Sequence, residues 1–469
     1  MIAAGMCAVM AAPTAGARQN DAADWLEHPI DTTWPVYSDS AQTAATSDAR
    51  WWERFEDSVL DSLVSQGLAN NYDIAMATRR IEMARDRVGQ ARAGYYPTVG
   101  LSAGYTRSRQ SGDMITPGGR ATTTGYWSLG ANLSWEIDIF GRVRAQVQEG
   151  QRNVKVSRAE RAGVKVSLEA EIASDYIQLR VLQAQLEVAR QHSESQLAAK
   201  HIAEARFDTG LASMMDVDQA NQVYYSTIAS IPRLESQIHN TVNAIATLLG
   251  VTPGELRRQL DPIRPIPHYI QLVATGVPMD LLRKRPDVVQ AEEQIGVCAS
   301  QLGIARKDWL PKLTLQGTVG VDAHNAGDLF KHNSFGYSIV PTLSWTLFDG
   351  FARKYNIAEA RQQMLNAIDS YNNTVITAVN EVDDALSTYF SSLHYIKALE
   401  DVVKASSQYD SRSLDNYKNG LSPYINVAQA QMSYLESMNT LIVAKGDALN
   451  ALITLYKALG GGWIDDELR

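Results

Sequence analysis

The sequence predicts a mixed fold of long packed α-helices and membrane β-strands, arranged as a duplicated unit of helix, β-hairpin, long helix and helix. Three observations predict this class. The two halves of the chain carry the same landmarks in the same order. Two proline-free stretches, 141–208 and 351–418, contain runs with a heptad spacing of apolar residues. Four short segments alternate apolar and polar side chains.

The duplication has a nearly constant spacing. Gly210 returns as Gly420, 210 residues later, whereas Pro97 returns as Pro311, 214 residues later. The difference therefore falls inside the strand pair, where a longer connecting loop costs little. We expect repeat 1 at 57–250 and repeat 2 at 279–460, with strands at about 97–107, 125–135, 311–321 and 335–346.

The stretches 141–208 and 351–418 are expected to be helices. From Val375 to Leu399, apolar residues recur mostly at alternating steps of four and three, the spacing of packed helices. At 1.5 Å per residue each helix could reach roughly 100 Å, which is far more than a globular core needs. Polar residues such as Gln183 and Arg190 indicate that one side faces water.

Each short segment has one apolar face and one face of small or polar residues. A length of about ten residues suits a tilted strand in a bilayer. A soluble sheet packed on a helix shows the same alternation, and from the strands alone it would be favoured. Aromatic residues where helix meets strand favour a membrane-interface girdle: Tyr95, Tyr96, Trp135, Trp309 and Trp345. Four strands cannot close a barrel, so several chains must pool them, and three chains would give twelve.

Composition excludes some classes of function. The chain has 469 residues, 45% of them hydrophobic, and its net charge of −9 includes no Lys/Arg block, so nucleic acid is not an expected partner. No apolar run is long enough for a transmembrane helix, so membrane insertion would use strands. Two cysteines, Cys7 and Cys298, offer no basis for an intrachain disulfide in the mature chain.

Several segments fall outside the repeats. Residues 1–17 are apolar, end in Ala15-Gly16-Ala17 and indicate an export signal peptide, although no Lys or Arg precedes Arg18. Cys7 follows Ala4-Gly5-Met6, a poor match to a lipid-attachment motif. The others are an extended arm at 18–56, a Pro-rich connector at 251–278 and a C-terminal tail at 461–469.

Seven stretches, taken together and in this order, resemble the outer-membrane efflux channel family that includes TolC and, more closely, OprM and the NodT-type proteins. They are LSWEIDIFGRVR (133–144), RFDTGLASMMDVDQA (206–220), LLRKRPDVVQAEEQIG (281–296), LGIARKDWLPKLTL (302–315), LSWTLFDG (343–350), YKNGLSPYINVAQAQ (417–431) and ALGGGW (458–463). The resemblance extends over nearly the whole chain, and its specificity lies in the ordered set.

The resemblance implies a homotrimer with a twelve-stranded β-barrel in the outer membrane, continued by a twelve-helix α-barrel through the periplasm. It implies a passive exit channel of a tripartite, RND-type efflux system with a role in multidrug resistance. Its expected partners are a periplasmic membrane-fusion adaptor, an inner-membrane pump and outer-membrane lipid. The chain is not expected to be an enzyme or to hold a cofactor or metal.

Two helix turns carry the expected adaptor contact, because glycine suits a left-handed helix end, serine suits the next helix cap and an exposed leucine invites a partner. The residues are Gly210, Leu211, Ser213, Gly420, Leu421 and Ser422. Turn chemistry alone would also explain the glycines and serines. The resemblance places a periplasmic gate just inside the turns, where Asp216 and Tyr417 link helices in the closed state. Asn426 and Gln429 stand there where the family pattern has carboxylates.

Other functions remain open. The channel could be the exit duct of a type I protein secretion system, or the chain could be a non-channel helical scaffold at the envelope. Catalysis has little support, since no HExxH sequence, phosphate-binding loop or nucleophile constellation is found and the 8 histidines are scattered.

Overall fold

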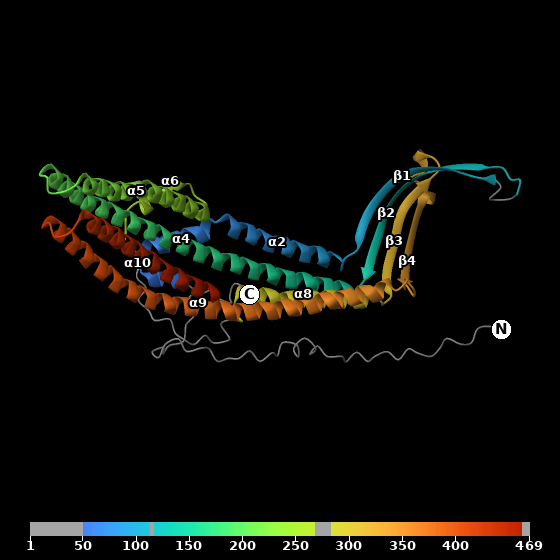
Figure 1. Cartoon of the computed structure of the whole chain (residues 1–469). Helices are drawn as coiled ribbons and strands as arrows, with labels where there is room; N and C mark the ends of the chain where they lie inside the picture. The colour runs from blue at the N-terminus through green and yellow to red at the C-terminus, as the bar shows by residue number, and fades with distance from the viewer. Residues whose placement is uncertain (1–49, 113–116, 268–282, 462–469) are drawn as a thin grey trace. The chain divides into compact units, whose positions relative to one another are not determined.

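The computed structural model describes residues 50–112, 117–267 and 283–461, all within one compact unit. The expected signal peptide, most of the arm, the connector beyond 267 and the tail from 462 lie outside the described residues. Figure 1 shows the elements, which follow one another as η1 (Trp51–Phe55), α1 (Ser58–Asn70), α2 (Tyr72–Ala93), β1 (Thr98–Gln110), β2 (Thr122–Ile137), α4 (Arg142–Asp208), α5 (Met214–Leu249), α6 (Pro253–Leu260), α8 (Pro286–Lys307), β3 (Lys312–Ala323), η2 (Ala326–Asp328), η3 (His332–Ser334), β4 (Phe335–Ser344), α9 (Ala352–Lys418) and α10 (Tyr424–Ala458).

The four strands form one antiparallel sheet in the order β1-β2-β3-β4 (Figure 1). The β2–β3 pairing joins the two hairpins and ends where Trp127 lies opposite Ala323. Pairing of β1 with β2 continues further, to Gln110 opposite Thr122. The first hairpin therefore projects beyond the second. Both outer strands, β1 and β4, are edges of the described sheet.

The registers pair odd-numbered residues with odd-numbered ones, so each parity occupies one face. The odd face is apolar: Val99, Leu101, Ala103, Tyr105, Trp127, Leu129, Ala131, Leu133, Trp135, Leu313, Leu315, Val319, Val321, Tyr337, Ile339 and Leu343. The other face is mostly Ser, Thr, Gly, Asn and Gln. Leu101 is 80% exposed and Ile339 68%, so the apolar face is not covered by a helix of the described chain and the soluble-sheet alternative is wrong.

The two 67-residue helices pack differently. α4 packs against α1, α2, α5, α8 and α10, and Ile172, Ile177 and Leu179 at its middle are fully buried. α9 packs mainly against α8 and α10 and leaves apolar side chains outside: Ile376 is 57% and Tyr395 53% exposed. α9 thus leaves apolar surface that no other described element covers.

Some elements differ from the sequence expectation. The strands of the first hairpin are longer than 97–107 and 125–135 because polar, Thr-rich pairing continues toward its turn. The connector contains α6, which begins at Pro253 and ends at Leu260 before Pro262. Proline suits the first turn of a helix, so the prolines bound this short helix at both ends while still preventing a continuous one.

Candidate functional site

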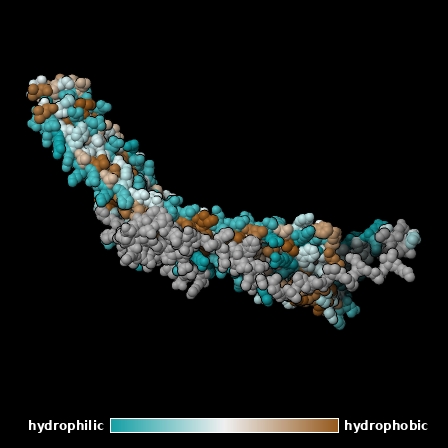
Figure 2. Space-filling model, turned by 60° about the horizontal axis from the view of Figure 1, so that its bottom comes forward, coloured by the Kyte–Doolittle hydropathy of each residue, from teal (hydrophilic) through white to brown (hydrophobic). Residues whose placement is uncertain are grey.

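Each long helix ends in the same turn. Gly210 has φ +73° and Gly420 φ +74°, the left-handed backbone that glycine adopts without Cβ strain. The N–H groups of Gly210 and Leu211 donate to carbonyls three and five residues earlier, both at 2.8 Å, and Gly420 and Leu421 repeat this pattern. These are Schellman motifs. Leu211 is 68% and Leu421 77% exposed, and Figure 2 shows hydrophobic surface at the end of the helices where the turns lie.

The serines do not cap the following helices as expected. Ser213 is the N-cap residue of α5 but its hydroxyl makes no capping bond, and the N-cap of α10 is Pro423. Pro423 has an extended backbone, with ψ 159°, and occupies the N-cap position, so α10 begins two residues after Ser422. The Ser422 Oγ instead accepts a hydrogen bond of 2.8 Å from Asn426 Nδ2. Ser213 thus has the expected N-cap position without the side-chain bond, and the capping role assigned to Ser422 is wrong.

Arg206 ties the two turns together, and the sequence did not single it out. Its Nη1 donates to the Lys418 carbonyl at 2.9 Å and its Nη2 to the Leu211 carbonyl at 3.5 Å. Its guanidinium lies 5.0 Å from the centre of the Tyr417 ring. A cation at two helix C-termini satisfies free carbonyls and is favoured by both dipoles. Only the closeness of two turns 210 residues apart gives Arg206 this role.

Tyr417 points into the protomer. It is 2% exposed and packs edge to face on Tyr424, with ring centres 5.1 Å apart. Its hydroxyl makes no hydrogen bond to any residue that the structure describes, so the expected bond to Asp216 is not formed here. Burial raises the pKa of Tyr417, the charge of Asp216 raises it further and Arg206 opposes both. Asp216 is therefore close enough to act on Tyr417 through its charge.

Asn426 and Gln429 are both exposed on the first turns of α10. Their spacing of three residues places them on one helix face. Asp216 is half-buried in the first turn of α5. One protomer does not form a gate, so the gate assignment stays a prediction.

The expected interface aromatics form two equivalent pairs. The Trp135 indole donates to the Tyr95 carbonyl at 3.1 Å, and the Trp345 indole to the Trp309 carbonyl at 3.0 Å. Each pair ties the helix-side end of a hairpin to the end of the preceding helix. Tyr96, beside them, is 71% exposed.

A second aromatic level lies toward the hairpin turns, and the sequence reasoning did not separate it from the alternating pattern. The Tyr105 and Trp127 rings are 4.8 Å apart, and those of Phe335 and Tyr337 6.4 Å apart. From Trp127 to Trp135 the strand covers roughly 26 Å, and tilt reduces this to a height near that of a barrel's apolar band.

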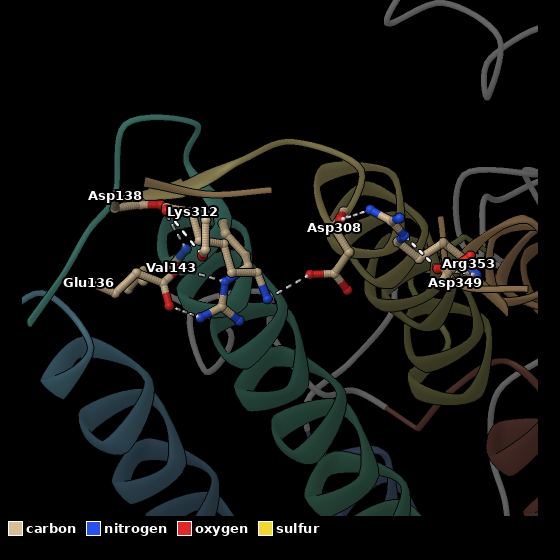
Figure 3. Close-up of polar contacts among 9 residues, drawn as sticks. Glu136, Asp138, Val143, Asp308, Lys312, Asp349 and Arg353 are labelled. Atoms are coloured by element: carbon tan, nitrogen blue, oxygen red, sulfur yellow. Dashed lines mark hydrogen bonds and ion pairs between the residues drawn. The ribbon is translucent and has the colours of Figure 1, made fainter. Parts of the chain in front are cut away.

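Acidic side chains hold the junctions between strands and long helices (Figure 3). Asp138 accepts hydrogen bonds from the N–H groups of Val143 and Arg144 at 3.1 and 3.0 Å, which caps the start of α4. Asp349 pairs with Arg353 at 2.5 Å and also accepts from the Arg353 N–H, at the start of α9. These bonds fix the direction in which each helix leaves the sheet.

Among the residues that the structure describes, no three His, Cys, Asp or Glu side chains lie close enough to hold a metal ion. Within the same ranges, no helix has an apolar stretch long enough to cross a membrane.

The fold is shared with a solved channel. The outer-membrane channel OprN matches with a TM-score of 0.83 and 28% identity, over 92% of this chain and 96% of that one. Together with the uncovered apolar sheet and the long helices, this match places the protein in the class of outer-membrane channels.

Two curated relatives agree with this class. A probable efflux pump outer membrane protein of Pseudomonas putida, TtgC, is 25% identical over 94% of this chain and 91% of its own length. Nodulation protein T of Rhizobium leguminosarum is 29% identical over 93% and 89%. The sequence profile of the outer membrane efflux proteins matches residues 63–251 and 277–461. The chain belongs to this family, and its location is the outer membrane.

Proposed function

We propose that three copies of this chain form one exit channel, in which twelve strands close a barrel in the outer membrane. The open edges of the sheet carry this proposal. Lipid does not satisfy the unpaired backbone groups of β1 and β4, whereas pooling strands from three copies leaves no edge. The uncovered odd face then meets lipid, and the four helices α4, α5, α9 and α10 of each copy extend the barrel as a twelve-helix duct.

The channel acts as the passive outer component of a tripartite, RND-type efflux system, with a periplasmic membrane-fusion adaptor and an inner-membrane pump as partners. The name of the relative TtgC, an efflux pump outer membrane protein, favours efflux over protein secretion or a scaffold role. The duct performs no chemical step and needs no cofactor, because its pump supplies both energy and cargo.

The two Schellman turns form the adaptor contact. Leu211 in the first turn and Leu421 in the second project into solvent, and Arg206 holds the two turns together through hydrogen bonds to both. An apolar side chain at an exposed tip gains free energy when a partner covers it. The aromatic pairs at the strand–helix junctions mark the periplasmic membrane surface, so the turns lie deep in the periplasm.

The purified protein tests the channel directly. We expect it in the outer-membrane fraction, as a trimer in detergent whose gel migration changes on heating, and as ion-conducting pores in planar bilayers. A water-soluble monomer that conducts no ions would overturn the proposal.

A further inference from the structure

The odd face of the sheet is apolar over the part that all four strands share and becomes basic at the projecting end of β1. Arg107 and Arg109 follow Tyr105 on the odd face of β1, opposite Gly125 and Thr123 of β2. Both arginines lie in the projecting part of the first hairpin, past the end of β3. They stand about 7 and 13 Å beyond Tyr105 along the strand.

The outer aromatic level sets the position of these arginines. A Cβ on Gly125 would lie 2.6 Å from the Tyr105 hydroxyl, so this hydroxyl occupies the space over Gly125, the cross-strand partner of Arg107. The hydroxyl therefore points away from the apolar band and toward the arginines. Tyrosine has this orientation at a membrane interface, with its ring in the apolar layer and its polar end outside it.

No described residue neutralises the two arginines of this projection. Arg107 and Arg109 are exposed, and neither forms an ion pair with a described residue. Between Tyr105 and Trp127 the sequence has three arginines, with Arg120, against one acid, Asp113. The second hairpin differs, since its Lys331 is paired with Asp328.

We propose that Arg107 and Arg109 bind the phosphate groups of the phosphorylated glycolipid in the outer leaflet of the membrane. This inference rests on the proposed barrel, which places the odd face against lipid and the hairpin turns outside the cell. Arginine presents a planar fork of donors that matches a phosphate. Arg107 and Arg109 are two residues apart in β1, so both side chains lie on the same face of the sheet. The site lies just outside the outer aromatic level, at the depth of lipid headgroups.

The test uses the full-length trimer in detergent and lipid A with two phosphates as the probe. Binding is measured by native mass spectrometry as a function of lipid concentration. The double variant Arg107→Gln, Arg109→Gln is expected to bind about tenfold more weakly than wild type. The matched control Arg79→Gln, Arg87→Gln removes two exposed arginines from α2, in the periplasm, and is expected to bind as wild type.

Two ligand controls need no variant. Phosphate-free lipid A is expected to bind equally weakly to wild type and to the double variant. Inorganic phosphate, at the same concentration as the lipid, is expected not to displace lipid A from wild type. Equal binding of lipid A to wild type and the double variant overturns the proposal, as does effective competition by free phosphate. Failure of the proposed channel itself is distinct, because then the wild type would form neither trimers nor pores.

Discussion

At the scale of single residues, the two repeats solve the same backbone problem with different side chains. The residue before α4 is Gly141 with φ +73°, and the residue before α9 is Phe351 with φ +69°, 210 residues later. A side chain with a Cβ costs about 1–2 kcal/mol in this left-handed conformation. Phe351 is 59% exposed, and its ring contacts Phe348 at 5.7 Å between centres.

Replacing Phe351 with glycine should therefore stabilise the trimer by about 1 kcal/mol, since the relieved strain exceeds a half-exposed ring contact. The temperature at which the trimer converts to monomer on a gel would rise. Gly141→Ala is the matched opposite and should lower it. A lower transition temperature for Phe351→Gly would show that the ring contact outweighs the backbone strain.

Asp175 makes the stability of the protomer depend on pH. It is partly buried on α4, and burial, with a smaller contribution from the charge of Glu171, raises its pKa to about 6. Because the folded-state pKa exceeds the unfolded value, stability is highest below about pH 4 and falls as the pH rises through 6. Asp175→Asn should remove this fall and stabilise the protein by about 1 kcal/mol at pH 7.5, after allowance for solvent screening. Urea unfolding of wild type and variant at pH 4.5 and 7.5 measures the difference in stability. The same pH dependence in both proteins would contradict this role of Asp175.

Local chemistry allowed some residues to be predicted from the sequence and not others. Gly210 and Gly420 adopt the expected left-handed backbone because that requirement is contained in the turn itself. Arg206 was missed because its partners belong to a turn in the other repeat. Ser422 was assigned wrongly because the neighbouring proline decides where α10 begins.

At the scale of elements, the periodicity of apolar residues in the sequence was sufficient to predict the order of the main helices and strands. The odd-even alternation and the long heptad runs are local signals, and they correspond to the observed strands and to α4 and α9. The β2–β3 pairing that joins the hairpins is not local, since it links Trp127 to Ala323 across α4, α5, α6 and α8. No pattern within either hairpin specifies that register.

Arg206→Ala should loosen the contact between the two helical turns. It leaves the Lys418 carbonyl without its donor and removes the cation from the Tyr417 ring, a loss of about 1–2 kcal/mol. Amide hydrogen exchange at Gly420 and Leu421 should become about tenfold faster, while α4 exchanges as before. Arg233→Ala, at an exposed position of α5, is the control. Unchanged exchange at both amides would show that Arg206 does not hold the turns.

The proposed adaptor contact predicts that assembly and export can be separated by mutation. In the double variant Leu211→Asp, Leu421→Asp, binding of the adaptor would bury a carboxylate at each tip. An apolar pocket offers that carboxylate no hydrogen-bond or ionic partner, so its desolvation opposes binding. Drug export from cells should be lost while trimer and pore remain intact. Leu211→Met with Leu421→Met keeps the apolar surface and should export normally. Unchanged drug resistance in the aspartate variant would count against the tips as the contact.

At the scale of the whole molecule, duplication has not produced two equivalent halves. α4 is enclosed by its own chain, whereas α9 leaves Ile376 and Tyr395 uncovered. Both helices have 67 residues, so length does not predict which one is enclosed. The apolar surface that α9 leaves uncovered suits contact with another copy, and a gate formed by helix ends would then depend on every copy of the proposed trimer.

The gate prediction concerns the proposed trimer. The buried Tyr417 hydroxyl has no hydrogen-bond partner in the described chain, and Asp216 already raises its pKa, so a small movement of α5 on closing would allow the hydroxyl to donate to the carboxylate. Such a charge-assisted bond is worth about 1.5–3 kcal/mol, enough to shift a closed-to-open balance about tenfold. Asp216→Ala with Tyr417→Phe should therefore raise single-channel conductance. Asp218→Ala, which removes an exposed carboxylate nearby, should not.

The amides at the constriction give this prediction a second, independent readout. Asn426 is exposed, and three copies of Asn426→Asp would add a ring of carboxylates that attracts divalent cations. Block by divalent cations added on the periplasmic side should appear in Asn426→Asp and remain weak in wild type. Equal conductance of wild type and the Asp216, Tyr417 double variant, with trimers assembled, would defeat the gate assignment, whatever the cation response of Asn426→Asp.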